Sequence, residues 1–269
     1  MTDQVVILAR GLGTRMRRAD PEAALSPEQA AVADTGLKAL LPVADRPFLD
    51  YVLAAAAEAG LRRACLVVGP EHGALRKHYG STPLHRLELA FAVQEEPRGT
   101  ADALAAAEQM VGDRPFLALN SDNYYPVEAL RPLCDLEGSG VALFERKAMG
   151  EQGNIPPERI SRLAVAVTEQ GFLRRIIEKP DPEELADLPP PILVSMNCWR
   201  FDPEIFRACR AIGPSARGEL ELPDAVQYAI DVLHHPFQAL TFALAVLDLS
   251  GRSDLPAVAA RLAAVEVDL

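Results

Sequence analysis

Short apolar runs alternate with amphipathic stretches along the first half of the chain. Continuous apolar runs are typical of buried strands, whereas apolar residues repeated at helical spacing indicate one face of a helix. These patterns predict strands at 5–8, 64–68, 87–93 and 115–119, and helices at 48–59, 71–79, 100–111 and 127–136. Their alternation favours an α/β fold with parallel strands, right-handed crossovers and helices on both faces of the sheet.

The second half of the chain is richer in β-forming residues. Two such runs, Leu163–Thr168 and Phe172–Ile177, flank a Glu-Gln-Gly turn and predict a hairpin. Beyond them we expect an extended segment at 192–201, helices from 202 and over 223–233, a last strand at 241–247 and a closing helix at 254–264. Residues 1–269 are therefore expected to form a single domain. Its first half, of the nucleotide-binding type, would reach about residue 125, and a substrate half on the same sheet would span about 126–269.

A long excursion follows the first strand, from residue 16 to residue 36. Within it, Ser26 followed by Pro27 is typical of a helix start, with serine as the N-cap and proline as the first helical residue. Long connections in compact domains are usually functional or mobile. We therefore expect a long loop that carries a short helix and is either functional or mobile.

The formal net charge of −11 over 269 residues argues against a nucleic-acid or anionic-membrane partner, for which a basic stripe would be expected. An anionic substrate would then need a local group of cations. A local group of cations follows the first strand, and its members are Arg10, Arg15, Arg17, Arg18 and Lys38. The four cysteines are spaced irregularly, which favours free thiols over a metal or redox motif. Because no leader pattern or membrane-length apolar run occurs, we expect a cytoplasmic protein.

The first strand leads into a glycine turn that ends in arginine, Gly11-Leu12-Gly13-Thr14-Arg15. Glycine at positions 11 and 13 lets the backbone take positive φ and bring successive N–H groups close to phosphate oxygens. Thr14 adds a hydroxyl, and Arg15 adds a planar fork of N–H donors. The turn lacks the full P-loop and dinucleotide-binding patterns. By itself it fits a phosphate-binding loop and an ordinary strand-to-loop turn equally well.

Two aspartates follow predicted strands. Asp122 comes after the strand that ends at Leu119, and Asp248 comes directly after Leu247. Ligands of α/β sheets bind beyond the carboxyl ends of the strands. If the two strands are neighbours, both carboxylates can share one Mg²⁺ ion whose shell phosphates and water complete. The alternative is that each aspartate simply opens a turn.

Two further sets of polar residues also follow strands. Glu178 and Lys179 end the strand 172–177, where they offer an acceptor for hydroxyls and a point charge for a phosphate. Gln94, Gly99 and Thr100 offer an amide and backbone N–H groups to the edge of a base. For Glu178 and Lys179 the alternative is an ordinary solvated pair of charges. For the second set it is simple capping of a helix by Thr100.

Seven motifs, in the same order, resemble those of the sugar-1-phosphate nucleotidylyltransferase family. They are LARGLGTRM (8–16), KALLPVADRP (38–47), GTADAL (99–104), SDN (121–123), IIEKP (176–180), GELELPDA (218–225) and LDLSGRSDL (247–255). The resemblance covers nearly the whole chain. It implies a Rossmann-like α/β fold with a mixed, mostly parallel sheet and helices on both faces, of the nucleotide-diphospho-sugar transferase type.

The resemblance also implies a reaction, the transfer of a nucleotidyl group from an NTP to a sugar 1-phosphate with release of pyrophosphate and use of Mg²⁺. UTP or dTTP is the expected nucleotide. The sugar phosphate needs no general base, because its second pKa of about 6 leaves it largely dianionic at neutral pH. The residues implied are Arg15 and Lys38 for catalysis, Leu8, Gly11, Gly13, Thr14, Gln94, Gly99 and Thr100 for the nucleotide, Glu178, Lys179 and Asn197 for the sugar phosphate, and Asp122 and Asp248 for the metal.

The chain departs from the family at several positions. Arg10 replaces a small residue, and the excursion over 17–36 is longer than usual. Arg162-Leu163 stands where Tyr-Gly commonly lines the sugar, and Asn197 lies in Met-Asn-Cys where Asn-x-Gly is common. The sugar pocket is thus the least transferable part, and neither the base nor the sugar is defined.

Two other functions stay open, as does a homo-oligomeric state. One is a non-catalytic, nucleotide-sugar-binding regulatory protein of the same fold, against which the intact Arg15, Lys38, Asp122 and Asp248 argue. The other is a glycosyltransferase of related topology, but the sequence has no Asp-x-Asp motif for its metal.

Overall fold

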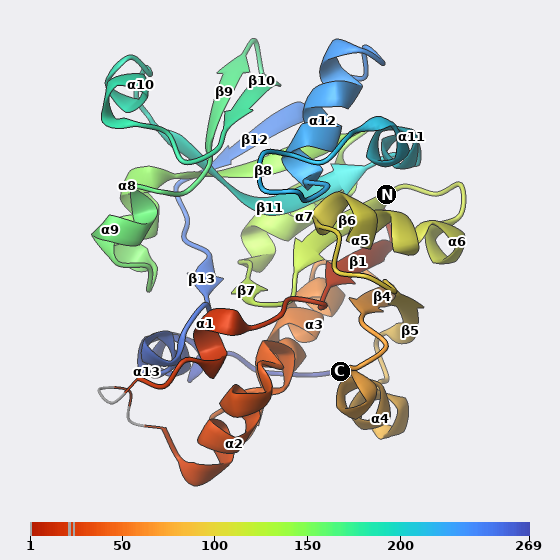
Figure 1. The fold of residues 1–269 in the computed structure, drawn as a ribbon, viewed down its shortest axis with the longest axis vertical. Helices are drawn as coiled ribbons and strands as arrows, with labels where there is room; N and C mark the ends of the chain where they lie inside the picture. Colours follow the sequence, from red (N-terminus) through yellow and green to blue (C-terminus); the bar gives the residue numbers. More distant parts are fainter. Residues whose placement is uncertain (1, 21–22, 24) are drawn as a thin grey trace.

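The computed structural model describes residues 2–20, 23 and 25–269. Within this part of the chain, nine strands form one central sheet (Figure 1). In spatial order the strands are β5 (Glu88–Val93), β4 (Arg63–Val68), β1 (Gln4–Leu8), β6 (Phe116–Asn120), β11 (Leu193–Phe201), β8 (Gly140–Glu145), β12 (Gln238–Phe242), β10 (Phe172–Ile177) and β9 (Val165–Glu169). Only β10 and β11 run against the others, so the predicted mixed, mostly parallel α/β sheet is confirmed.

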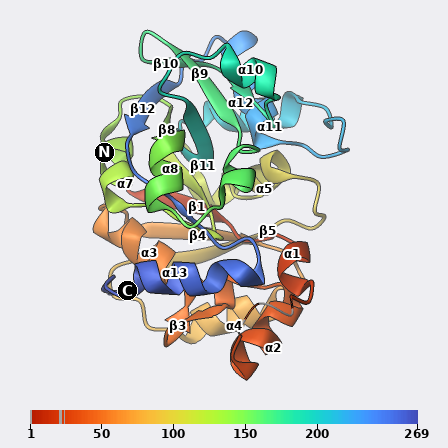
Figure 2. The same cartoon turned by 90° about the vertical axis from the view of Figure 1, so that its left-hand side faces the viewer.

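Helices cover both faces of this sheet, as the alternation of elements predicts (Figure 2). Successive residues of a strand point to opposite faces. Accordingly Val5 and Ile7 of β1 pack in one hydrophobic core, and Val6 packs in the other. The first core contains residues of α3 (Phe48–Glu58), α4 (Gly73–Ser81), α7 (Val127–Asp135), α8 (Arg146–Gln152), α9 (Pro157–Ile160) and α13 (Leu255–Leu262). The second contains residues of α5 (Thr100–Ala106), α6 (Glu108–Val111), α11 (Glu204–Ala211) and α12 (Leu222–Asp231).

The strand order reverses at β1, which lies between β4 on one side and β6 on the other. Both neighbours run parallel to β1, and Leu8 at its carboxyl end is level with Asn120 of β6. Ligands of doubly wound sheets bind at such a switch point, beyond the carboxyl ends of the strands. The fold therefore directs attention to the segments that follow β1 and β6.

The excursion after β1 carries the predicted helix. It contains α1 (Thr14–Arg17) and α2 (Pro27–Thr35), and its residues 21, 22 and 24 lie outside the described part of the chain. Ser26 caps α2 as expected: its hydroxyl accepts the N–H of Gln29, whose side chain in turn accepts the N–H of Ser26. This reciprocal capping box defines the start of the helix.

The hairpin and most other predicted elements are present, but several predictions are wrong. The expected helix 100–111 breaks at Ala107 into α5 and α6. The expected strand 241–247 is two elements, because β12 ends at Phe242 and Leu247–Asp248 forms β13, which pairs with β7 (Asn123–Tyr124). Elements that were not predicted include β8, α8, α9 and α10 (Pro182–Ala186). A small ribbon of β2 (Pro42–Val43) and β3 (Arg46–Pro47) leads into α3.

The four cysteines are free and buried, in agreement with the thiol interpretation. Burial raises the pKa of Cys65 to about 11 and that of Cys209 to about 12, so these thiols stay protonated at neutral pH. In the described part of the chain, no helix combines the length and apolar character needed to cross a membrane.

Candidate active site

A small cavity of about 240 Å³ lies where β1 and β6 end, and we call it the strand-end cavity. Five of the predicted site residues line it: Leu8, Gly11 and Thr100, expected to bind the nucleotide, Lys38, expected to be catalytic, and Asp122, expected to bind the metal. They come from segments far apart in the sequence. The switch point of the sheet thus brings a large part of the expected site together.

The glycine turn combines two glycines with different surroundings. Gly13 has φ of +59°, and a Cβ at this position would overlap the carbonyl oxygen of Gly36 at the far end of the excursion. Only glycine fits there. Gly11 is not in the left-handed region, so the expectation of positive φ is wrong for it, and no protein atom lies within 4 Å of a Cβ built on it. The open space beside Gly11 belongs to the strand-end cavity.

These surroundings give a prediction for two alanine variants. Gly13→Ala should destabilise the fold by about 1 to 3 kcal/mol or more, because it adds left-handed strain to a steric clash. Gly11→Ala should change stability by less than about 0.5 kcal/mol, as at other open sites. If the cavity holds the nucleotide, Gly11→Ala should nevertheless raise the KM for NTP, since the new methyl group enters the cavity.

Thermal unfolding and steady-state kinetics of both variants check this prediction. An unchanged KM in Gly11→Ala would show that the nucleotide does not approach the turn at this residue.

Lys38 and Asp122 form an ion pair in the strand-end cavity. Lys38 Nζ lies 2.9 Å from Asp122 Oδ2, and the two side chains are 15% and 31% exposed. Lys38 begins a 3₁₀ turn, Lys38–Leu40, that follows the excursion, whereas Asp122 follows β6. The pair therefore holds the excursion against the central sheet and leaves part of the Asp122 carboxylate open to the cavity.

Asp248 lies beside Asp122, although through a different pairing from the one expected. Residue 248 of β13 is level with Asn123 of β7, and the N–H of Leu249 donates to the carbonyl of Asp122 at 2.9 Å. Burial raises the pKa of Asp248 above its ordinary value, and the negative charge of Asp122 raises it further, while Ser250 and Arg159 act in the opposite direction. The two aspartates are neighbours, as a shared ion would require.

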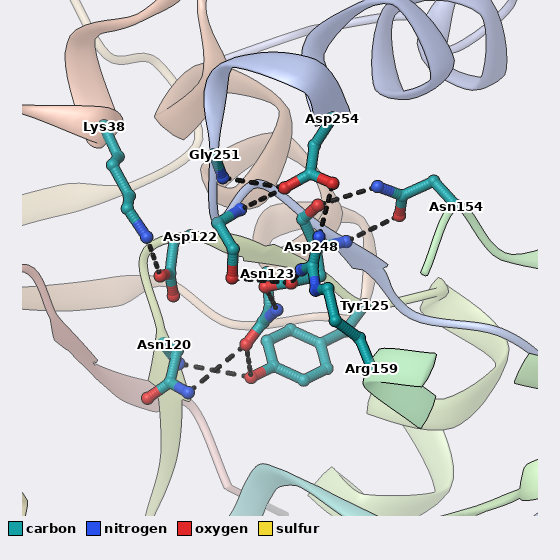
Figure 3. Close-up of polar contacts among 11 residues, drawn as sticks. Lys38, Asn120, Asp122, Asn123, Tyr125, Asn154, Arg159, Asp248, Gly251 and Asp254 are labelled. Atoms are coloured by element: carbon teal, nitrogen blue, oxygen red, sulfur yellow. Dashed lines mark hydrogen bonds and ion pairs between the residues drawn. The ribbon is translucent and has the colours of Figure 1, made fainter. Parts of the chain in front are cut away.

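Asp248 is densely hydrogen-bonded (Figure 3). Asn123 Nδ2 donates to its Oδ1 at 3.0 Å, and Ser250 Oγ donates to its Oδ2 at 2.7 Å. Arg159 forms an ion pair with the same Oδ2. The backbone N–H of Asp248 donates to the side-chain oxygen of Asn154, and the backbone carbonyl of Asp248 accepts from the side-chain amide of Asn154, each at 2.8 Å. These contacts explain how a two-residue strand holds one defined position.

A larger cavity of about 710 Å³ adjoins Asp248, and we call it the basic cavity. Its charged lining residues are Arg15, Arg18, Asp20, Arg159, Arg162, Lys179, Asp248 and Arg252. Six cations against two carboxylates make the lining strongly positive in a chain with a formal net charge of −11. Such a cavity is suited to an anionic ligand of the size of a phosphorylated sugar.

The residues expected to read the base are partly used by the protein itself. Gln94 is buried, and its Nε2 donates to the carbonyl of Gly99 at 3.0 Å and to Asp102 Oδ2 at 2.8 Å. Gly99 has φ of +120°, and a Cβ there would overlap the carbonyl oxygen of Leu220. Thr100 does not cap its own helix, because its hydroxyl accepts the N–H of Leu222 at 2.9 Å at the start of α12. Gln94 therefore holds the start of α5, Thr100 joins α5 to α12, and the contact of these residues with a base stays a prediction.

The three residues expected to bind the sugar phosphate separate in space. Lys179 lines the basic cavity with its backbone at φ of +48°. Glu178 lies outside the lining of both cavities, and crowding by protein atoms, with the negative charges of Glu221 and Asp224 nearby, raises its pKa. Asn197 also lies outside both linings, and its Oδ1 accepts the indole N–H of Trp199 at 3.3 Å. Of the three, only Lys179 is placed to contact a ligand in the basic cavity.

Metal binding can be tested against the donors present. In the described residues, no group of three or more His, Cys, Asp or Glu side chains gathers to hold an ion. Mg²⁺ usually takes one or two protein carboxylates and completes its shell with phosphates and water, so two adjacent aspartates fit its chemistry. Each carboxylate, however, already has a cationic partner, Lys38 on Asp122 and Arg159 on Asp248.

Several site residues were missed by the sequence reasoning. Arg159 lines the basic cavity together with Arg162, whose position the resemblance had already placed at the sugar, and Asp254 accepts a hydrogen bond from Arg159 Nη1 at 2.5 Å. Tyr125 is buried, and its hydroxyl donates to the carbonyl of Met196 at 2.7 Å. Arg159 lies on α9, in a segment for which no element was predicted, so no local pattern indicated it.

Comparison with known proteins identifies the class. Residues 4–242 match the family model described as Nucleotidyl transferase, and the chain belongs to that family. The resemblance to sugar-1-phosphate nucleotidylyltransferases that the motifs indicated is thereby confirmed. The match includes Asp122 and ends before Asp248.

Individual relatives extend this result. The chain is 30% identical to the low-salt glycan biosynthesis nucleotidyltransferase Agl11 of Haloferax volcanii, with 84% of this chain and 58% of that protein covered. It is 27% identical to the UTP–glucose-1-phosphate uridylyltransferase YngB of Bacillus subtilis, with 83% and 77% covered. A crystal structure of UDP-glucose pyrophosphorylase complexed with UDP-glucose superposes with a TM-score of 0.74 at 21% identity, covering 97% of this chain and 98% of that one. This last likeness confirms the fold.

Proposed function

We propose that this chain transfers a nucleotidyl group from an NTP to a sugar 1-phosphate and releases pyrophosphate. The observation that carries the proposal is the convergence of Gly11, Lys38 and Asp122 at the switch point of the sheet, with Asp248 at the adjoining basic cavity. Nucleotidyl transfer needs an electropositive place for a triphosphate beside one for a second phosphate. Lys38 in the strand-end cavity and the six cations of the basic cavity support this proposal.

The reaction requires little proton transfer by groups of the protein. An oxygen of the sugar phosphate forms a bond to the α-phosphorus of the NTP as the bond to pyrophosphate breaks, and the attacking oxygen is already ionised. The protein contributes alignment of the two substrates and neutralisation of charge on the leaving group. Lys38 and Arg15 are the cations that we assign to the triphosphate.

Mg²⁺ is the ion that Asp122 and Asp248 would hold, and it would neutralise charge on the phosphates. The protein residues orient this pair: Lys38 fixes one oxygen of Asp122, and Asn123 with Ser250 fixes the carboxylate of Asp248. Because relatives are named for UTP and glucose 1-phosphate or for thymidylyl transfer, UTP or dTTP with glucose 1-phosphate is the first pair to try.

A crossed pair of variants tests the division of roles within the basic cavity, which both Arg15 and Lys179 line. Lys179→Ala should raise the KM for the sugar 1-phosphate by about tenfold to a hundredfold, the range expected for a lost contact to a charged group, and should alter the KM for NTP far less. Arg15→Ala should do the reverse. If both variants weaken the same substrate, the assignment of the two cations to different phosphates is wrong.

A further inference from the structure

Arg159 occupies an unusual place for a cation, between two buried carboxylates (Figure 3). Its Nη2 forms an ion pair with Asp248 Oδ2, and its Nη1 donates to Asp254 Oδ1 at 2.5 Å. The side chains of Asp248 and Asp254 are 13% and 5% exposed, whereas that of Arg159 is 30% exposed and lines the basic cavity. The guanidinium thus bridges the buried acids from the side of the cavity.

The contacts of Asp248 differ in how firmly they are held. Asn123 lies directly opposite Asp248 in the β7–β13 pair, and Ser250 is two residues along the same turn. Both donors are therefore fixed to the backbone that positions Asp248. Arg159 comes instead from α9, a single helical turn far away in the sequence, at the end of a long side chain. Of the three donors to this carboxylate, Arg159 is the one that can leave without moving β13.

The second partner of Arg159 is more firmly placed than the first. Asp254 Oδ2 accepts the N–H groups of Ser250 at 2.9 Å and Gly251 at 2.7 Å, which leaves Oδ1 for Arg159. If the contact between Arg159 and Asp248 is broken, Asp254 Oδ1 still accepts the hydrogen bond from Arg159 Nη1. The guanidinium would then pivot on Asp254 and present its other N–H groups to the basic cavity, where Lys179 and Arg15 also lie.

We propose that Arg159 is the resident counter-cation of Asp248, that a divalent ion must displace it, and that the displaced guanidinium binds the phosphate of the sugar substrate. The first part follows from the contacts, the second rests on the proposed metal site, and the third rests on the proposed function. Lys38 on Asp122, with Arg159 shared by Asp248 and Asp254, reduces the charge of these three carboxylates to −1, so the site should bind a divalent ion weakly in the absence of substrates. A planar arginine fork released into the cavity matches phosphate oxygens. Arg159 is accordingly a positioning residue in the free protein and a substrate ligand in the loaded one.

The test is to measure Mn²⁺ binding to the full chain without substrates. The concentration of free Mn²⁺ is determined from its electron paramagnetic resonance signal. Arg159→Gln should bind Mn²⁺ about tenfold more tightly than the parent, the scale of a displaced contact to a charged group. Arg162→Gln is the matched control, because it removes the same charge from the same cavity, yet in the described structure Arg162 has no carboxylate partner. Its affinity should stay within about twofold of the parent, as for an exposed charge. Adding Asp248→Asn to Arg159→Gln should remove the gain.

Two results would overturn the proposal: equal Mn²⁺ affinity in the two glutamine variants, or a gain that persists without the carboxylate of Asp248. Should Arg159→Gln fail to fold, Arg159→Lys serves in its place, since one ammonium cannot bridge both acids. It should bind Mn²⁺ more tightly than the parent, and parental affinity would overturn the proposal.

The substrate half of the proposal has its own measurement. Mn²⁺ should tighten binding of glucose 1-phosphate to the parent protein, measured by calorimetry, and should do so less in Arg159→Gln than in Arg162→Gln. An equal effect in both variants contradicts the role of the displaced guanidinium. None of these readouts needs turnover, so absence of pyrophosphate release would contradict the proposed function alone.

Discussion

Removal of divalent metal should abolish turnover, and this is the largest effect that the account predicts. Asp122 of the strand-end cavity and Asp248 of the basic cavity are the two neighbouring carboxylates that the described residues offer to a metal. With excess chelator, the charge of the triphosphate would be opposed only by side chains, of which Lys38 is already paired with Asp122. Lewis-acid stabilisation of a phosphoryl-transfer transition state contributes several kcal/mol, so the rate should fall by at least about 1,000-fold.

Pyrophosphate release measured before and after chelation checks this prediction, with Mg²⁺ and then Mn²⁺ added back. Recovery of the rate with either ion shows that the loss is not damage to the fold, and a thermal unfolding curve in chelator controls for stability. A full rate in excess chelator would mean that the cationic side chains replace the metal entirely.

The second large effect is expected for Asp122→Asn, which should lower kcat by about 100-fold to 1,000-fold, the cost of removing one charged group that acts on the transition state. The fold should survive, because this side chain is 31% exposed and its one described ion pair is with Lys38. Asp45→Asn is a suitable control: Asp45 is 79% exposed, pairs with Arg46 at 3.5 Å and lines neither cavity.

Kinetics and thermal unfolding of both asparagine variants provide the comparison. A normal kcat in Asp122→Asn, or an equal loss in Asp45→Asn, would show that the metal does not bind at the carboxyl end of β6.

The fold was predictable from the sequence because the alternation of strands and helices dictates parallel pairing and two covered faces. The capping box at Ser26 was readable because it depends only on neighbouring residues. The strand 241–247 was misread because its apolar run is continuous, whereas the boundary between β12 and β13 depends on which distant strand each part meets. Pairing partners are tertiary information that a local pattern does not contain.

The sequence predicted which strand ends carry site residues better than it predicted the contacts that those residues make. Strand ends placed Asp122 and Lys179 beside cavities. The sequence could not show that Glu178, next to Lys179, lies outside the basic cavity, because the chain bends after β10 and Lys179 takes a φ of +48° that the motif does not indicate. Nor could it show that Arg159 meets Asp248, since that pair joins segments 89 residues apart.

The central claim is nucleotidyl transfer to a sugar 1-phosphate, and one measurement tests it most directly. The protein is incubated with Mg²⁺, each NTP in turn and a panel of sugar 1-phosphates that begins with glucose 1-phosphate, and both pyrophosphate and the NDP-sugar are followed. The account predicts that pyrophosphate and NDP-sugar appear in equal amounts, only when both substrates are present, with UTP or dTTP most active. Binding of nucleotide or NDP-sugar without turnover in any combination would contradict it and would instead favour a regulatory protein of this fold.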